Sequence, residues 1–203
     1  MAKSRDDSTL HWIDPDDRGI LPLDKFHVPK SLKKTLKRGS YEIRIDTAFA
    51  QVIEECAGSV PGRDETWINQ TIIDLFTQLH RFGIAHSVES WRDGRLMGGL
   101  YGLSLGGAFF GQSMFSRATD ASKVALVDLV ARLKLGGFIL LDTQFVTNHL
   151  AQFGAEEIPR REYLKRLNRA TELPGTFHQG PVPWEEALSI PPYFQNQPIP
   201  SPI

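Results

Sequence analysis

Apolar and polar residues recur along the chain with two periods. The helical period of three to four residues is clearest at Ile72, Leu75, Phe76 and Leu79, ahead of Gly83. The same period, with Pro or Asp before several segments and Gly after them, predicts six helices. We expect these helices at residues 29–38, 47–57, 72–79, 120–135, 147–153 and 160–169.

Other segments predict strands. Residues 41–45 alternate between polar and apolar, and residues 86–92 and 95–105 flank Asp93-Gly94, which favours a two-residue hairpin turn. Short apolar runs at residues 108–111 and 138–141 predict two further strands. The helix between these runs suits a crossover connection between parallel neighbours. This order predicts an α+β, acyltransferase-like fold with a mixed sheet and flanking helices.

The composition changes at Pro174. Residues 174–203 contain eight of the 13 prolines and no Lys or Arg. Proline lacks a backbone donor and disrupts helix interiors and central strands, so we expect a mostly extended Pro-rich tail, with Trp184 or Phe194 packed on the body. We therefore divide the chain into an N-terminal segment of residues 1–40 with a basic helix, a domain of residues 41–173, and the tail of residues 174–203.

The composition indicates a globular protein and argues against membrane-spanning, secreted and disulfide-rich classes. The 203 residues are 41% hydrophobic and 23% charged, which is typical of a globular chain with a core. No apolar run reaches the roughly 20 residues of a membrane span, and the N-terminus has no basic-then-apolar signal. The single cysteine, Cys56, excludes an internal disulfide framework and a cysteine-based zinc site. We expect a cytoplasmic protein, a monomer by default, without a membrane partner.

Positive charge is concentrated in two short segments, although the formal net charge is −1. Residues 30–38 and 160–169 hold ten of the 23 basic residues and one acid, Glu162. The candidates for phosphate contacts are Lys30, Lys33, Lys34, Lys37, Arg38, Arg160, Arg161, Lys165 and Arg166. One such segment is explained by a solvated helix. Two in a small domain also fit a surface for a nucleic-acid backbone.

Polar residues follow the predicted strand at residues 138–141. Asp142 and Gln144 lie at its carboxyl end, where ligands bind in sheets with helical crossovers. Two positions apart in an extended backbone, they point to the same side. A carboxylate beside an amide can orient it, so that the amide oxygen accepts a hydrogen from an amine. The alternative is that Asp142 only caps the following helix.

The remaining polar candidates give weaker signals. His86 and Glu89 are three positions apart on a predicted strand, so they face opposite sides and are unsuited to act as a pair. His149 is better placed, but no two histidines have the spacing of metal ligands. Ser113 and Ser116 lack the surroundings of a nucleophile elbow. We expect neither a metal nor a cofactor.

Trp67 lies on a predicted loop before the helix that contains Ile72. An exposed indole can stack on a nucleotide base, with a contribution of about 1–3 kcal/mol. Packing of the indole against the core is equally compatible with the sequence.

Eight short motifs occur between residues 9 and 168. They are Gly111-Gln-Ser-Met-Phe-Ser-Arg117, Asp142-Thr-Gln144, Glu65-Thr-Trp67-Ile68, Ala85-His-Ser-Val-Glu-Ser-Trp91, His11-Trp-Ile-Asp-Pro15, Phe26-His-Val-Pro-Lys30, Ala121-Ser-Lys123 and Gly154-Ala-Glu-Glu-Ile-Pro159. Together they closely resemble the motifs of the leucyl/phenylalanyl-tRNA–protein transferase family.

The resemblance implies an enzyme that moves Leu or Phe, and less well Met, from an aminoacyl-tRNA to a protein with an N-terminal Arg or Lys. The product is marked for N-degron degradation. By the family pattern, Gln144 accepts a hydrogen from the attacking amine, Asp142 holds Gln144, Trp67 stacks on the terminal adenosine, and the basic helices meet tRNA phosphates. The same resemblance implies that the apolar pocket for the Leu or Phe side chain is lined by Leu100, Phe109, Met114, Leu129 and Leu133. Residues 41–173 are expected to form a GNAT-like (acetyltransferase-like) catalytic domain.

The chain departs from the family pattern in three places. Gln112 replaces the usual Glu, and Asn148 replaces the usual Asp, so each change removes a negative charge. A Glu at position 112 could hold the aminoacyl ammonium by a charge-assisted bond, whereas Gln holds it more weakly and predicts reduced transfer. The N-terminal segment is also shorter than is usual in the family.

Two other functions compete with this interpretation. Gln112 and Asn148 are compatible with a homologue that binds tRNA or peptide but transfers weakly. A coenzyme-A-dependent N-acetyltransferase would share the fold type. That chemistry needs a Gly-rich pyrophosphate loop before the central helix, where this chain has Arg117-Ala-Thr-Asp120.

Overall fold

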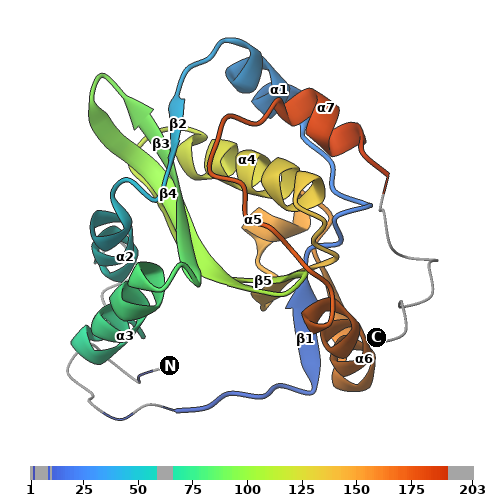
Figure 1. The fold of residues 1–203 in the computed structure, drawn as a ribbon. Helices are drawn as coiled ribbons and strands as arrows, with labels where there is room; N and C mark the ends of the chain where they lie inside the picture. Colours follow the sequence, from blue (N-terminus) through green and yellow to red (C-terminus); the bar gives the residue numbers. More distant parts are fainter. Residues whose placement is uncertain (1, 3–8, 10, 59–65, 192–203) are drawn as a thin grey trace.

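The computed structural model describes residues 2, 9, 11–58 and 66–191 (Figure 1). Within these residues, seven strands form one sheet and seven helices flank it. The strands are β1 (Asp17–Ile20), β2 (Glu42–Ile45), β3 (Ala85–Arg92), β4 (Arg95–Leu105), β5 (Ala108–Ser116), β6 (Leu140–Gln144) and β7 (Glu156–Pro159). The helices are α1 (Lys30–Lys37), α2 (Phe49–Ala57), α3 (Gln70–Arg81), α4 (Ala121–Leu135), α5 (Asn148–Ala151), α6 (Arg160–Thr171) and α7 (Trp184–Ser189).

The sheet is mixed, as the sequence predicts. Its strand order is β2-β3-β4-β5-β6-β1-β7, and only the pairing of β5 with β6 is parallel among the described strands. Helix α4 connects these two strands, so the predicted crossover is confirmed. The hairpin between β3 and β4 is also confirmed. Asp93 and Gly94 both have the positive φ, 53° and 69°, that its two-residue turn requires.

Helices cover both faces of the sheet. Phe109 and Leu141 face α4, and α1 and α7 pack beside that helix. The neighbouring residues Ala108 and Leu140 face the other side, towards α6. Helices α2 and α3 cover this second face nearer to β3 and β4 (Figure 1). The sequence-distant helices α1 and α6 therefore lie on opposite sides of the sheet.

Two short strands, β1 and β7, are absent from the sequence prediction. Each has four residues, and β1 contains Asp17, Arg18 and Gly19, whereas β7 ends at Pro159. A segment this short and polar carries no periodicity that a single sequence reveals. The structure also extends β5 to Ser116 and shifts β6 to Leu140–Gln144, so Asp142 and Gln144 lie within the strand rather than after it.

The described part of the predicted tail is ordered against α4, and the prediction of a mostly extended tail is wrong for α7. We call residues 174–190 the C-terminal strap. The strap runs beside α4, and its last part forms helix α7 (Figure 1). Pro183 immediately precedes the first helical residue, a position where proline does not interrupt intrahelical bonds. Residues 192–203, with the remaining prolines, lie outside the described residues.

Buried Arg132 on α4 holds the strap. Its guanidinium donates to the carbonyl oxygens of His178 and Gly180, and to Asp128 one turn earlier on α4 at 2.7 Å. Phe177 of the strap stacks on Phe109, with ring centroids 5.6 Å apart. Burial raises the pKa of Asp128, although the nearby Arg132 opposes that change. The strap therefore completes the core on the α4 side.

No helix in the described part of the chain is both long and apolar enough to cross a membrane.

Candidate functional site

The parallel pairing of β5 and β6 ends where the predicted site begins. The last paired residues are Phe110 and Asp142. From there β6 continues beside β1, with Gly19 opposite Gln144, and β5 continues beside β4. A Cβ atom on Gly19 would lie 2.6 Å from the carbonyl carbon of Phe145, so the absence of a side chain there lets the end of β6 pass close to β1.

Gln112 is the additional residue of a β-bulge. Gly102 of β4 pairs with Gly111, and the preceding Tyr101 pairs with Ser113, so Gln112 has no partner of its own on β4. Bulges redirect side chains at sheet edges and at functional sites. This bulge places the Gln112 side chain against Gln144 of β6.

Asp142 is fully buried, and donors surround its carboxylate. Arg18 donates from Nη2 at 2.9 Å and from Nε at 3.1 Å. The Tyr163 hydroxyl donates at 2.5 Å, and the main-chain N–H of Gln144 donates at 2.7 Å. The positive charge of Arg18 and these hydrogen bonds offset the cost of burying the charged carboxylate. Asp142 thereby ties β6 to β1 and α6.

The side-chain amide of Gln144 has a defined orientation. Its nitrogen donates to the carbonyl oxygen of Gly111 and to Oε1 of Gln112, each at 3.2 Å. A main-chain carbonyl only accepts, so the nitrogen must face Gly111 and the amide oxygen must point elsewhere. Among the described residues, no donor binds this oxygen. It is therefore available as an acceptor for a ligand.

Asp142 holds Gln144 differently from the way the sequence suggests. Gln144 has a φ of 66°, outside the extended region, so simple alternation along the strand does not relate the two side chains. The carboxylate binds the main chain of Gln144, whereas Gly111 and Gln112 orient its amide. The alternative role of Asp142 as a cap is wrong, because the side chain of Thr147 caps α5.

Two residues of the cluster around Asp142, Arg18 and Tyr163, are absent from the site predicted from the sequence. Arg18 comes from β1 and Tyr163 from α6, and each is far from Asp142 in the chain. Burial and the hydrogen bond to Asp142 both raise the pKa of Tyr163, so its hydroxyl stays protonated. Burial opposes the charge of Arg18, but Asp142 outweighs this effect and raises the Arg18 pKa. The one local signal was that Tyr163 is an aromatic residue within a basic segment.

The residues expected to line an apolar pocket come together on the α4 face. Leu100, Phe109, Leu129 and Leu133 are at most 2% exposed and belong to one core cluster, with Met114 partly buried against it. Phe177 of the strap covers one face of Phe109. The five residues therefore share a location, and in this state their side chains are packed against one another.

Trp67 lies on the other face of the sheet. It is half-buried against the cluster that contains Val52, Tyr101 and Phe115. The indole is thus neither on a fully exposed loop nor enclosed in the core. The structure does not bring it into the cluster that contains Leu100 and Phe109.

The two basic segments form separate surfaces. On α1, Leu32 is buried whereas Lys30, Lys33, Lys34 and Lys37 are exposed, as is the following Arg38. On α6, Arg161 and Lys165 are exposed, Arg160 is exposed and pairs with Asp14, and Arg166 is half-buried and pairs with Glu162 at 3.1 Å. Because α1 and α6 lie on opposite sides of the sheet, the structure does not join these residues into one patch.

The histidine candidates remain separate from the cluster around Asp142. His86 contacts Asp46 at 2.8 Å, while Glu89 accepts the main-chain N–H groups of Thr47 and Ala48 on the opposite side of β3. The predicted separation of His86 from Glu89 is confirmed. His149 is partly buried, and burial followed by the charge of Lys123 lowers its pKa.

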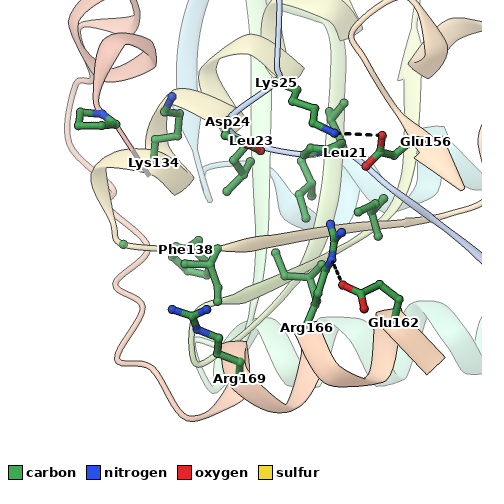
Figure 2. Close-up of a pocket in the computed structure, with 17 residues that line it drawn as sticks. Leu21, Leu23, Asp24, Lys25, Lys134, Phe138, Glu156, Glu162, Arg166 and Arg169 are labelled. Carbon is green, nitrogen blue, oxygen red and sulfur yellow. Dashed lines mark hydrogen bonds and ion pairs between the residues drawn. The ribbon is translucent and has the colours of Figure 1, made fainter. Parts of the chain in front are cut away.

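A cavity of about 360 Å³ lies near the start of β6 (Figure 2). Leu21 and Phe138 line it, and two ion pairs lie among its lining residues, Lys25 with Glu156 and Arg166 with Glu162. Of the site residues predicted from the sequence, it contains Arg166 alone. The cavity is therefore distinct from the Asp142 cluster.

The described residues contain no cluster of three His, Cys, Asp or Glu side chains arranged to hold a metal ion. What the arrangement offers chemically is hydrogen bonding. The side-chain oxygen of Gln144 is an acceptor, and the side-chain nitrogen of Gln112 is a donor. The nearby buried carboxylate of Asp142 is already paired with Arg18 and Tyr163. Such a site is suited to orienting a neutral nucleophile and a polar acyl group.

The fold and the cluster around Asp142 define an α+β protein with a mixed sheet and a hydrogen-bonding site where the parallel pairing of β5 and β6 ends. Residues 20–168 match the family described as leucyl/phenylalanyl-tRNA protein transferase. The chain belongs to this family.

Curated relatives agree with this assignment. A leucyl/phenylalanyl-tRNA–protein transferase from Paramagnetospirillum magneticum is 60% identical over 189 residues, which is 93% of this chain and 90% of the relative. Proteins of the same name from Phenylobacterium zucineum and Caulobacter vibrioides are each 61% identical over 178 residues, 88% of this chain and 80% or 82% of the relative.

Solved structures give a weaker likeness. The C-terminal domain of a putative lysylphosphatidylglycerol synthetase from Agrobacterium fabrum has a TM-score of 0.47 at 12% identity, over 82% of this chain and 67% of that chain. The L-PGS structure from Bacillus licheniformis has a TM-score of 0.44 at 14% identity, over 85% and 57%. These scores are too low to support an inference about function.

Proposed function

We propose that this protein transfers Leu or Phe, and less well Met, from an aminoacyl-tRNA to the N-terminal Arg or Lys of an acceptor protein. The product enters N-degron degradation in the cytoplasm. Membership of the family supports the reaction class. The observation that carries the assignment to a site is the fixed amide of Gln144, whose oxygen is left available beside the buried Asp142.

In this reaction the acceptor's α-amine attacks the carbonyl carbon of the aminoacyl ester. Gln144 Oε1 accepts one N–H of that amine and so directs the nitrogen lone pair at the carbon. The new C–N bond replaces the C–O bond to the ribose, and the amine proton leaves on the ribose oxygen. The ester is already activated, so positioning and proton removal are the main demands on the protein.

Asp142 acts in this proposal as a positioning residue. Its carboxylate is occupied by Arg18, Tyr163 and the main chain of Gln144, so its role is to fix the end of β6. Gln144 keeps a left-handed backbone conformation that costs about 1 kcal/mol or more, and the hydrogen bond from its N–H to Asp142 helps to maintain it.

The substrate contacts are further parts of the proposal. Leu100, Phe109, Met114, Leu129 and Leu133 receive the aminoacyl side chain after local rearrangement of their packing. An apolar pocket discriminates by only about 1–3 kcal/mol per methylene, which is compatible with Leu, Phe and Met as related substrates. Trp67 stacks on the terminal adenosine, and the exposed cations of α1 and α6 meet tRNA phosphates. We also propose that residues 41–173 supply most of an acetyltransferase-like catalytic domain, which β1 of the N-terminal segment completes between β6 and β7, and that the protein acts as a monomer.

The test uses labelled Leu-tRNA and a peptide with an N-terminal Arg. We expect label in the peptide with the wild-type chain, and at least about tenfold slower transfer with Gln144→Met, which removes the acceptor at nearly constant volume. Gln78→Met, on the exposed surface of α3, is the matched control and should transfer normally. Normal transfer by Gln144→Met would contradict the assignment of this site.

A second candidate function is a tRNA- or peptide-binding homologue with weak transfer, which the uncharged Gln112 favours. Tight tRNA binding without label in the peptide would identify it. A coenzyme-A-dependent acetyltransferase is disfavoured. The N-terminus of α4, where a pyrophosphate would bind, carries the carboxylate of Asp120, which contacts Lys123 at 3.1 Å and accepts from Thr35.

A further inference from the structure

The amide of Gln112 presents its nitrogen, rather than its oxygen, to the site. Gly111 fixes the Gln144 amide because the carbonyl oxygen of Gly111 can only accept. The Gln144 nitrogen then donates to Gln112 Oε1 at 3.2 Å. If the Gln112 amide were turned round, two NH₂ groups would face each other, so one main-chain carbonyl determines the orientation of both amides.

The outward-facing nitrogen of Gln112 is available to a ligand. Gln112 is half-buried, and among the described residues no acceptor binds its Nε2 atom. Asp142 does not supply the negative charge that Gln112 lacks, because its carboxylate is turned towards Arg18 and Tyr163. The site therefore offers a substrate N–H donors next to the Gln144 acceptor.

The substrate atom nearest to these donors follows from the proposed reaction. The attacking amine at Gln144 Oε1 must lie about 3–3.5 Å from the ester carbonyl carbon. The substrate's own α-nitrogen is attached to the adjacent carbon. Because Gln112 is hydrogen-bonded to Gln144, its Nε2 atom is within reach of that nitrogen and its substituents.

A donor at this position disfavours a charged α-nitrogen. An ammonium group carries donors only, so it cannot form a hydrogen bond with the Gln112 NH₂ group, whereas a glutamate at this position would accept from it. An acylated α-nitrogen is uncharged and brings a carbonyl oxygen that accepts from Gln112. Resting on the proposed function, we infer that this chain also uses N-acyl-aminoacyl-tRNA as its donor substrate.

The chemistry of this second donor is unchanged. The acceptor amine attacks the ester carbonyl, the C–N bond forms, and the C–O bond to the ribose breaks, with the amine proton on the released ribose oxygen. The N-acyl group takes no part and remains on the product, which then has a blocked N-terminus. Gln112 accordingly determines donor specificity at the α-nitrogen.

The experiment compares Phe-tRNA with N-acetyl-Phe-tRNA for the wild type, Gln112→Glu and Gln112→Met. Wild type should transfer both at rates within about threefold. Gln112→Glu should favour Phe-tRNA by at least about tenfold, since it gains a charge-assisted bond to the ammonium and loses the donor to the acyl oxygen. Gln112→Met offers neither a donor nor a negative charge. Its ratio of the Phe-tRNA rate to the N-acetyl-Phe-tRNA rate should therefore lie between the ratios of wild type and Gln112→Glu.

A binding measurement separates this inference from the proposed function. The probes are 3′-phenylalanylamido-adenosine and its N-acetyl derivative, which cannot transfer, and calorimetry gives their Kd values. Equal or tighter binding of the acetylated probe to wild type, reversed in Gln112→Glu, supports the inference. If Phe-tRNA is transferred but wild type rejects both acetylated compounds, or if Gln112→Glu slows both donors equally, the inference is wrong. If neither donor is transferred, the proposed function fails, while the two Kd values still report the preference of Gln112.

Discussion

At the residue scale, the site depends on how one buried carboxylate is satisfied. A charged group removed from water is retained only where a counter-charge and hydrogen bonds replace its hydration. For Asp142 these come from three different elements, since Arg18, Tyr163 and Gln144 belong to β1, α6 and β6. Of these partners, Tyr163 contributes only its hydroxyl group, which a substitution to Phe removes without other change to the side chain.

We predict that Tyr163→Phe lowers the free energy of unfolding by about 1–3 kcal/mol, because it leaves a lone pair of buried Asp142 without a donor. The raised pKa of Tyr163 means that the folded chain retains this proton more strongly than the unfolded chain. The stabilisation is therefore fully present below the unfolded pKa, near 10, and declines only as the pH rises through the folded pKa.

Urea unfolding at about pH 6 and pH 9 checks this prediction, because the difference between wild type and variant should be the same at both values. Tyr41→Phe is the matched control, since its hydroxyl donates to Thr119 in an exposed position. A cost no greater than that of Tyr41→Phe would show that Asp142 does not need the Tyr163 hydroxyl.

At the element scale, the sequence predicts the helices and strands that have a strong hydrophobic period. It does not predict the elements that are stabilised mainly by their neighbours in the fold. The crossover helix α4 and the β3–β4 hairpin carry their own signals, and both are confirmed. Strand β1 and helix α7 carry no such signal. Pairing with β6 stabilises β1, and packing against α4 stabilises α7. The position of Asp142 and Gln144 after an apolar run predicts them as site residues, whereas Arg18 lies on a strand that the sequence does not predict.

Gly19→Ala should disturb the contact between β1 and β6 specifically. A Cβ atom there meets the main chain of Phe145 at 2.6 Å, and main chain next to Gln144 cannot move away without displacing that residue. We expect transfer to fall at least about tenfold, by misplacement of the Gln144 acceptor. The assay with Leu-tRNA measures this change, and Gly180→Ala, which meets nothing within 4 Å, is the control.

Arg132→Met should release the strap from α4. The change removes the donors to His178 and Gly180 and leaves buried Asp128 without its partner, at a cost of about 3–5 kcal/mol. Chemical unfolding measures the loss. The double variant with Asp128→Leu should recover part of it, since the isolated charge is then removed. A double variant no more stable than Arg132→Met would show that the strap contacts alone account for the effect.

At the scale of the whole molecule, the positive charge lies on two sides of one sheet. The sequence shows that the basic residues are concentrated in two segments, although the net charge is close to zero. It does not show that α1 and α6 are on opposite sides, because that depends on which face of the sheet each helix covers. If both helices meet one tRNA, that tRNA must contact both sides of the protein, so the contribution of each helix can be measured independently.

Neutralising Lys30, Lys33, Lys34 and Lys37 to Gln should weaken tRNA binding and reduce its salt dependence. For every phosphate that the variant no longer neutralises, the slope of log K against log salt becomes shallower by about 0.7–0.9. Filter binding across a salt series measures this slope, and Arg161→Gln with Lys165→Gln provides the same measurement for α6. An unchanged slope in the α1 variant would show that α1 does not touch the tRNA.

The insertion of β1 between β6 and β7 has a consequence for the order in which the protein folds. The contact between Arg18 and Asp142 spans 124 positions in the chain. Contacts of such long range form late, because the loop between them must close first. During synthesis, the first strand has no partner until the second half of the chain has left the ribosome. We therefore expect the Asp142 cluster to assemble near the end of folding, once the second half of the chain is available to pair with β1.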